Sequence, residues 1–134
     1  MDAKIPPSEE SEGVTLPRAT EEDFLAALGD ASSRRILLTL DTSAQPVHDL
    51  VVALNLPQST VYHKLHELQR MGLVTIQSVT ITSDGKRLEL FRSLLESVRI
   101  EMIGGKLIVK VRYRNLAAER LGQMWEAMRK EVKR

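Results

Sequence analysis

The feature that most constrains the fold of this chain is a pair of short apolar patterns, each with helical spacing, separated by about three residues. The first covers residues 47–54, where apolar side chains recur at positions i, i+3, i+4 and i+7. The second places Val61, Leu65 and Leu68 on one face and ends at Gly72, a residue type that terminates helices. Two helices joined by so short a turn predict a helix-turn-helix.

Two more helices are predicted before this pair. Apolar residues at helical spacing indicate one helix over residues 20–28 and another over residues 31–40. Asp30 stands between them and is of a type that caps helix N-termini, because its carboxylate accepts hydrogen bonds from free backbone N–H groups. The apolar stripe of the first helix consists of Phe24, Leu25 and Leu28.

A β-hairpin is predicted directly after the helix-turn-helix. Residues 73–82 are rich in Val, Ile and Thr, residues 83–86 (Ser-Asp-Gly-Lys) have turn chemistry, and residues 87–91 resume an apolar alternation. A hairpin in this position is a wing.

A second hairpin and a final helix follow. Apolar and charged residues alternate over residues 98–102 and 107–113, with a tight Gly-Gly turn at 104–105, so one face is expected to be apolar and the other strongly cationic. The final helix is predicted over residues 115–132. Its apolar stripe contains Leu121, Met124, Trp125 and Met128.

Charge is unevenly distributed along the 134 residues. Residues 1–23 hold seven acids and two bases, whereas residues 24–134 hold 17 bases and 11 acids. Residues 1–18 also contain three prolines among Ser and Glu, with little apolar content, which predicts a disordered acidic tail. The basic remainder suits a polyanionic partner such as nucleic acid, although many soluble domains carry a similar surplus.

Several functional classes are disfavoured. The chain has no cysteine, so it can form neither a disulfide nor a thiolate metal site. It has no long apolar run and no signal-like N-terminus, and we expect a soluble protein located in the cytoplasm. No phosphate-binding loop, nucleophile elbow or convincing acid-base pair is present, so we expect neither enzymatic activity nor a cofactor.

Metal binding is also disfavoured. Two histidines three residues apart on a helix can chelate zinc, but here they lie on the polar outer face predicted for the second helix of the motif. The residues considered for this role are His48, Asp49, His63, His66 and Glu67.

Three stretches resemble the winged helix-turn-helix of ArsR-type transcription regulators. They are LGDASSRRILLTL, PVHDLVVALNLPQSTVYHKLHELQRMGLV and TSDGKRLELFR, and the resemblance covers roughly residues 24–92. The part after residue 92 is more similar to archaeal members, in which a short β segment with a glycine turn precedes a final helix. The resemblance implies DNA binding and dimerisation through terminal helices.

Candidate DNA-binding residues lie mainly on the second helix of the motif. If Val61, Leu65 and Leu68 face the core, helical geometry turns the polar side chains toward a DNA groove. Basic residues at the wing turn are expected to meet phosphates or the minor groove, and two arginines open the helix after Asp30. The full set is Gln58, Ser59, Thr60, Tyr62, His63, Lys64, Arg70, Lys86, Arg87, Arg34 and Arg35.

Each of these assignments has a simpler alternative. The polar helix face and the basic wing tip can both be merely solvated, and Arg34 or Arg35 can pair with Asp30 or Asp41 instead of DNA. The cationic face of the second hairpin can extend the DNA footprint, but a solvated face is the more common outcome. It contains Lys106, Lys110, Arg112 and Arg114.

The predicted fold class is α+β, mainly α: a winged helix-turn-helix with an additional C-terminal β-hairpin and a terminal dimerisation helix. We divide the chain into a disordered tail (residues 1–18), a DNA-binding domain (19–92) and a dimerisation extension (93–134). The terminal stripe either packs on its own winged core or seals a homodimer against the first helix of a second chain. The predicted dimer interface contains Phe24, Leu25, Leu28, Leu121, Met124, Trp125 and Met128.

The predicted function is a sequence-specific, homodimeric transcription regulator that binds double-stranded DNA. The alternative is a winged helix used as a protein-interaction module that docks on the transcription machinery, because a fold does not fix a function. A docking helix more often exposes apolar anchors, whereas residues 58–64 are mostly hydrogen-bonding and contain no acid. A nonspecific chromatin-like binder is disfavoured because it would need a larger cationic surplus.

Overall fold

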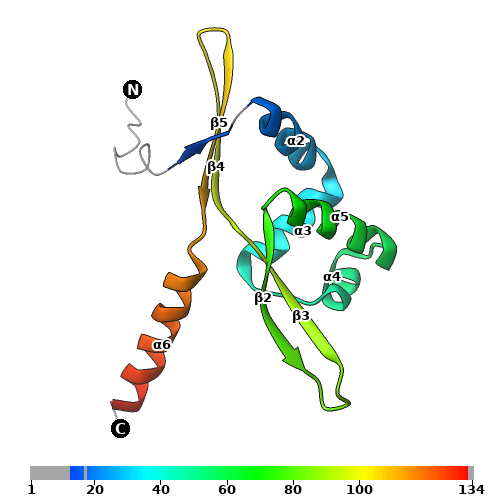
Figure 1. Ribbon diagram of the computed structural model, residues 1–134, viewed down its shortest axis with the longest axis vertical. Coiled ribbons are helices and arrows are strands. Elements are labelled where there is room, and N and C mark those ends of the chain that lie inside the picture. The colour runs from blue at the N-terminus through cyan, green and yellow to red at the C-terminus, as the bar shows by residue number, and fades with distance from the viewer. Residues whose placement is uncertain (1–12, 17, 133–134) are drawn as a thin grey trace.

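The computed structural model describes residues 13–16 and 18–132 (Figure 1). A two-residue strand and four helices come first, two hairpins follow, and a long helix ends the described chain. The elements are β1 (Val14–Thr15), α2 (Arg18–Gly29), α3 (Ala31–Thr42), α4 (Val47–Leu54), α5 (Gln58–Arg70), β2 (Val74–Ile81), β3 (Arg87–Ser93), β4 (Leu95–Ile103), β5 (Lys106–Tyr113) and α6 (Leu116–Val132). The predicted α+β winged helix-turn-helix is confirmed, and no helix among the described residues is long and apolar enough to cross a membrane.

Helices α2 to α5 form a body around one apolar core. The side chains predicted to face inward from α5, Val61, Leu65 and Leu68, are all buried there. Phe24 of α2 is only 1% exposed, so it belongs to the core of its own chain. The prediction that Phe24 seals a dimer interface is therefore wrong, because its ring already packs inside the protomer.

Local backbone chemistry sets the angles between the helices. Asn55 ends α4 in the left-handed conformation, with φ 53° and ψ 47°. At the end of α5, Gly72 also has a positive φ of 78°. Its N–H donates to the carbonyl of Gln69 at 3.0 Å, and the Leu73 N–H donates to that of Leu68 at 2.9 Å. These two bonds form a Schellman motif, which stops the helix and turns the chain into the wing.

The wing is the antiparallel hairpin of β2 and β3. Its register shifts between Ile76 and Ser78, which indicates a bulge there. Gln45, in the connection between α3 and α4, forms a bridge with Phe91 of β3 through two 2.9 Å backbone hydrogen bonds. This bridge fixes the wing against the helical body.

The second hairpin belongs to a separate three-stranded sheet in the order β1-β5-β4. Strand β1 was not predicted: Val14 and Thr15 pair with Val111 and Lys110, although the sequence places them in a disordered tail. Leu16 is also buried in the core, and α2 already begins at Arg18, whereas residues 1–12 and 17 of the predicted tail lie outside the described residues. Short strands such as β1 depend on their partner strand and carry little local signal, which is why the sequence did not reveal it.

The two faces of this sheet differ less in charge than predicted. The apolar face is confirmed, since Val109 and Val111 are fully buried. The opposite face is mixed rather than strongly cationic, because Lys110 lies 3.9 Å from Glu101 and Arg112 lies 3.1 Å from Glu96. Acids on β4 thus offset two of the basic residues of β5, whereas Arg99 of β4 lies opposite Lys110.

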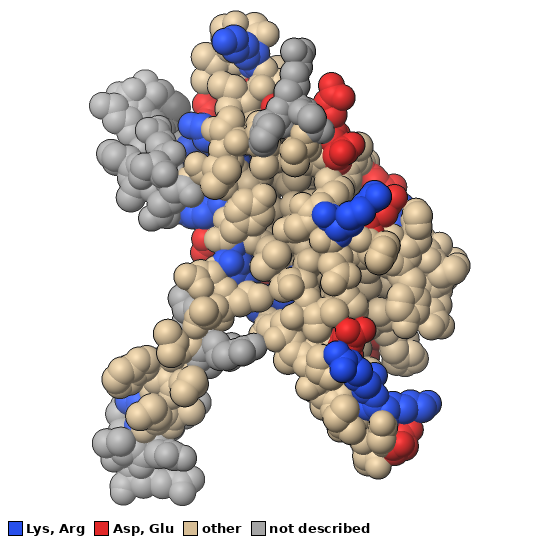
Figure 2. All heavy atoms as spheres, in the orientation of Figure 1, with Lys and Arg blue, Asp and Glu red and all other residues tan. Residues whose placement is uncertain are grey.

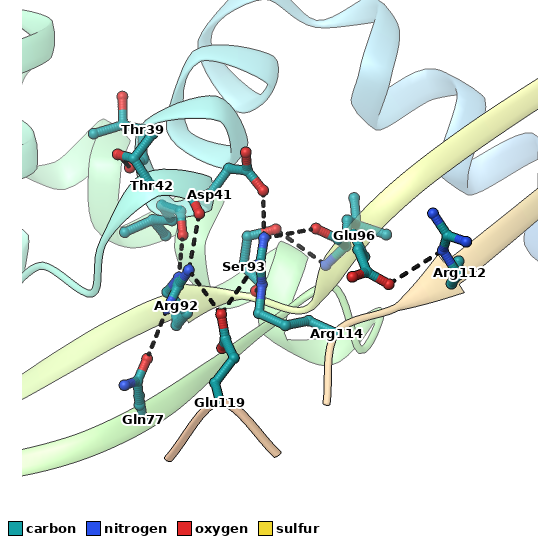
Figure 3. Close-up of polar contacts among 12 residues, drawn as sticks. Thr39, Asp41, Thr42, Gln77, Arg92, Ser93, Glu96, Arg112, Arg114 and Glu119 are labelled. Atoms are coloured by element: carbon teal, nitrogen blue, oxygen red, sulfur yellow. Dashed lines mark hydrogen bonds and ion pairs between the residues drawn. The ribbon is translucent and has the colours of Figure 1, made fainter. Parts of the chain in front are cut away.

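A polar junction joins α3, the wing and α6 (Figure 3). The buried Arg92 of β3 donates to the carbonyls of Leu40 and Asp41, both at 2.9 Å, and so satisfies carbonyl groups in the last turn of α3. Arg114 pairs with the Asp41 carboxylate and, at 3.2 Å, with Glu119 of α6. Glu119 also accepts from Arg92 at 3.5 Å. The two arginines therefore hold the start of α6 against the winged body.

Beyond this junction α6 extends away from the body (Figure 1). The apolar stripe predicted from the sequence is on the helix, but it is not covered by the described part of the chain. Leu121, Met124, Trp125 and Met128 are all exposed, Trp125 by 70%. Packing of this stripe on its own winged core, one of the two predicted outcomes, is therefore not observed.

Candidate nucleic-acid interface

The outer face of α5 is polar and open to solvent. Ser59, Tyr62, His63, His66 and Arg70 are all exposed, on the side opposite the core residues of the same helix. The sequence-based assignment of the two faces is thus confirmed. Hydroxyl, imidazole and guanidinium groups on one exposed helix face can hydrogen-bond to base edges and phosphates.

The N-terminus of α5 has free backbone donors. Its N-cap residue, Pro57, makes no side-chain hydrogen bond, and the first bond of the helix runs from the Val61 N–H to the Pro57 carbonyl at 3.1 Å. The N–H groups of Gln58, Ser59 and Thr60 consequently have no partner within the helix. Together with the helix dipole, such donors attract phosphate.

A cleft between α5 and the wing consists of two neighbouring hollows, and both Tyr62 and Glu89 of β3 line each of them. The walls of the first hollow also include Gln58, His48 of α4 and Arg87 of β3, whereas the second extends along α5. The α5 residues along this second stretch are His63, His66 and Gln69. The set predicted from sequence includes neither His48 nor Glu89, since no local pattern tells which face of β3 meets α5.

Lys64 does not belong to the exposed face. Its ammonium lies 2.8 Å from the Asp30 carboxylate, and its side chain is largely covered. Asp30 caps α3 by accepting from the Ser33 N–H at 2.9 Å. The hydrogen bond from Lys64, helped by Ser33, lowers the pKa of Asp30 to about 2. Lys64 therefore connects α5 to the start of α3 instead of extending from the polar face.

The two arginines of α3 contact backbone carbonyls. Arg34 donates to the Leu28 carbonyl at 2.6 Å, and Arg35 donates to the carbonyl of Leu54, the last residue of α4, at 3.1 Å. The alternative prediction, that one of them pairs with Asp30 or Asp41, is not observed. Those two acids pair instead with Lys64 and Arg114. Both arginines remain exposed beside these contacts.

The wing tip presents two basic side chains on an ordered turn. The Lys86 side chain is 81% exposed, and Arg87 is exposed next to it. The Lys86 N–H donates to the Thr82 hydroxyl at 3.0 Å, and Thr82 in turn donates to Asp84, which lowers the pKa of that carboxyl. Figure 2 shows Lys and Arg side chains gathered at this end of the wing, with acids close by.

Metal-binding groups do not converge in the described part of the chain. No three His, Asp or Glu side chains there are grouped as a metal site requires. His63 and Glu67, one turn apart on α5, lie 3.6 Å from one another. Both of these side chains are more than half exposed.

These features define a winged helix-turn-helix whose second motif helix and wing tip are open to a partner. Residues 30–75 match the sequence model of the family described as "Bacterial regulatory protein, arsR family". That segment contains α3, α4 and α5, and it is similar to the helix-turn-helix of that family. The match supports a DNA-binding transcription regulator.

The chain is similar to the crystal structure of NolR from Sinorhizobium fredii, with 19% sequence identity over 95% of this chain and 96% of that chain and a TM-score of 0.42. No curated protein matches the chain in sequence.

Proposed function

We propose that this protein is a homodimeric, sequence-specific DNA-binding transcription regulator. The observation that carries the proposal is the exposed polar face of α5, which begins with uncapped backbone amides and stands across a cleft from a basic wing tip. This combination fits insertion of a helix N-terminus into the major groove of DNA with the wing on the backbone or in the minor groove.

The residues have different roles in this proposal. Gln58, Ser59, Tyr62 and His63 point from α5 and are assigned to base edges, Gln58 to an adenine. Thr60 is half-buried and is assigned to phosphate through its backbone N–H. The remaining basic residues hold the DNA backbone without reading sequence. They are Arg34, Arg35, Arg70, Lys86 and Arg87.

The homodimer is proposed because α6 carries an uncovered apolar stripe. Four large apolar side chains exposed on one helix favour burial against a second chain. Leu25 and Leu28 of α2 are half-buried and remain as the other predicted members of the interface, whereas Phe24 is withdrawn from it. A two-fold dimer would place two α5 helices in successive major grooves, about 34 Å apart.

The decisive experiment is selection from a randomised duplex pool at two salt concentrations, followed by sequencing of the DNA that stays bound at the higher salt. We expect an enriched palindrome with half-sites about one helical turn apart. Binding that disappears as salt rises, without any enriched sequence, would leave only a nonspecific phosphate contact and contradict the proposal. That outcome would favour the alternative, a winged helix that docks on the transcription machinery.

A further inference from the structure

Strand β4 is an unpaired sheet edge. The sheet order β1-β5-β4 leaves the outer side of β4 without a neighbouring strand among the described residues. The strand runs for nine residues, Leu95–Ile103, and its outer part projects with β5 beyond the helical body (Figure 1). Natural proteins usually cover or shorten such edges, because free N–H and C=O groups in a row recruit another strand.

Apolar side chains line one face of this edge. Val98, Ile100 and Met102 alternate along β4 and are exposed by 36%, 48% and 85%. Directly across the hairpin, Val111 and Val109 are fully buried opposite Val98 and Ile100. The apolar side chains of this face are thus buried on β5 and exposed on β4.

On the other face of the hairpin, one basic side chain lacks an acidic partner. Arg99 lies directly opposite Lys110, a like-charged pair, in the register of β4 and β5. Lys110 is compensated by Glu101, whose carboxylate is 3.9 Å from its ammonium. Arg99 has no acidic partner within the described chain. Like charges opposite one another destabilise a sheet unless an opposite charge is added nearby.

We propose that β4 pairs antiparallel with β4 of a second copy of this chain, about a two-fold axis at Ile100. Residues opposite one another in a sheet lie on the same face. The apolar residues Val98, Ile100 and Met102 all have even numbers, so they contact one another across the new pair only in registers that put even-numbered positions opposite even-numbered ones. A two-fold axis at Arg99 would place Arg99 opposite the same arginine of the second copy, and an axis at Glu101 would place the two Glu101 carboxylates opposite one another. Both registers put like charges together. The centre at Ile100 is the register between them, and it avoids both repulsions.

The same register supplies the missing acid. It places Arg99 opposite the partner's Glu101 and, by symmetry, Glu101 opposite the partner's Arg99. Each arginine then lies between Lys110 of its own sheet and a carboxylate of the other chain. The two-fold axis therefore generates two ion pairs between Arg99 and Glu101, and both lie on the polar face of the sheet.

The apolar face is self-complementary in this register as well. Met102, the most exposed of the three apolar residues, comes opposite the partner's Val98. In each chain Val98 lines a groove between β4 and α3, with Leu28, Leu37 and Leu38 among its walls. The tip of one hairpin therefore covers the apolar groove at the base of the other.

This contact uses neither the apolar stripe of α6 nor the polar face of α5, and it shares only Leu28, in the wall of the groove, with the interface proposed for α6. The stripe of α6 lies on a helix that leaves the sheet at the end opposite the hairpin tip (Figure 1), and α5 lies on the other side of the body. The pairing can therefore join copies independently of DNA and of α6. A chain with two such contacts associates beyond a dimer as its concentration rises.

The test is charge reversal measured by sedimentation velocity over a range of protein concentrations, without DNA. We expect Arg99→Glu and Glu101→Arg each to weaken association about tenfold or more, because each puts like charges opposite one another twice. The double variant, with both charges exchanged, should associate like the original chain. An equimolar mixture of the two single variants should also associate, since every opposed pair is then of opposite sign.

The matched control is Lys106→Glu, which makes the same change of charge at the hairpin tip outside the paired register. It should leave association unchanged. Equal association of all variants, loss of association that neither the double variant nor the mixture restores, or an original chain that stays monomeric would each overturn the pairing. A monomeric original chain would also contradict the homodimer of the proposed function, whereas the other two outcomes leave that proposal untouched. The charge variants therefore distinguish a failure of the β4 pairing from a failure of the proposed function.

Discussion

Asp30 performs two tasks with one carboxylate. It caps α3 through Ser33, and it holds Lys64 of α5 at 2.8 Å. An acid at this position is easily recognised as a helix cap from sequence, but the lysine that it binds is 34 positions away and belongs to another helix. The second task could therefore not be predicted from local pattern.

Replacing Asp30 separates the two tasks. Asp30→Ala removes both cap and charge and should lower the free energy of unfolding by about 1 kcal/mol or somewhat more, as loss of an N-cap does. Asp30→Asn keeps an acceptor for the Ser33 N–H and should cost less. Urea unfolding near neutral pH compares the two, and equal losses would mean that the cap contributes nothing of its own.

The same pair predicts a pH dependence. The folded pKa of Asp30 is about 2, below its ordinary value of 3.8, so the unfolded chain binds the proton more readily. The stabilisation by the charge is therefore complete above about pH 4 and is lost as pH falls toward 2. The difference in unfolding free energy between the original chain and Asp30→Asn should shrink over this interval; a difference that grew with acidity would contradict the assignment.

We expect one set of residues to recognise the base sequence and another to bind phosphates. Tyr62→Ala and His63→Ala should each weaken operator binding by about 1–3 kcal/mol and leave random DNA less affected, whereas Lys86→Ala should weaken binding to both. Fluorescence anisotropy on the two DNAs measures this. Lys106→Ala, a lysine on the other hairpin, serves as the control, and equal losses on both DNAs for all three variants would refute the division of roles.

At the level of the elements, one glycine determines where the recognition helix stops. Gly72 has a φ of +78°, and no atom lies within 4 Å of the position a Cβ would occupy. Any cost of a side chain there is therefore backbone strain and not a clash. Gly29 ends α2 with equal space and without a positive φ, which makes it a matched comparison.

Gly72→Ala should destabilise the protein by about 1–2 kcal/mol, the cost of a left-handed conformation for an L residue. Gly29→Ala should be neutral or stabilise by about 0.4–1 kcal/mol, because it restricts only the unfolded chain. Chemical denaturation of both variants measures these changes in the free energy of unfolding. Similar effects at the two positions would show that the Schellman turn is not what Gly72 provides.

At the scale of the whole molecule, the body, wing and α6 are linked through Arg92 and Arg114. These arginines bring together the last turn of α3, the base of both hairpins and the first turn of α6. The sequence shows them only as ordinary basic residues and predicts Arg114 on a cationic surface of the second hairpin. Their partners become visible only when the fold brings Arg92 of β3 and Arg114, just after β5, to Asp41 in the last turn of α3.

The stripe of α6 leads to a prediction about the assembled dimer. Trp125→Ser should weaken binding to a full palindrome while leaving the weak binding to a single half-site unchanged, because it removes apolar area from the interface and touches no DNA-facing residue. Titrations against both duplexes measure this. An equal loss on the half-site would mean that the substitution acts through the fold of the protomer instead.

The sequence by itself determined the elements of this protein and the faces of its helices. Periodicity, caps and glycine turns act between residues that are close in the chain, so α2 to α6, both hairpins and the polar face of α5 follow from local pattern. The tertiary structure alone decided which charges find partners. It turned Lys64 toward Asp30, placed Phe24 in the core, added β1 to β5 and left β4 as an open edge. Those outcomes depend on contacts between distant segments, which no local pattern encodes.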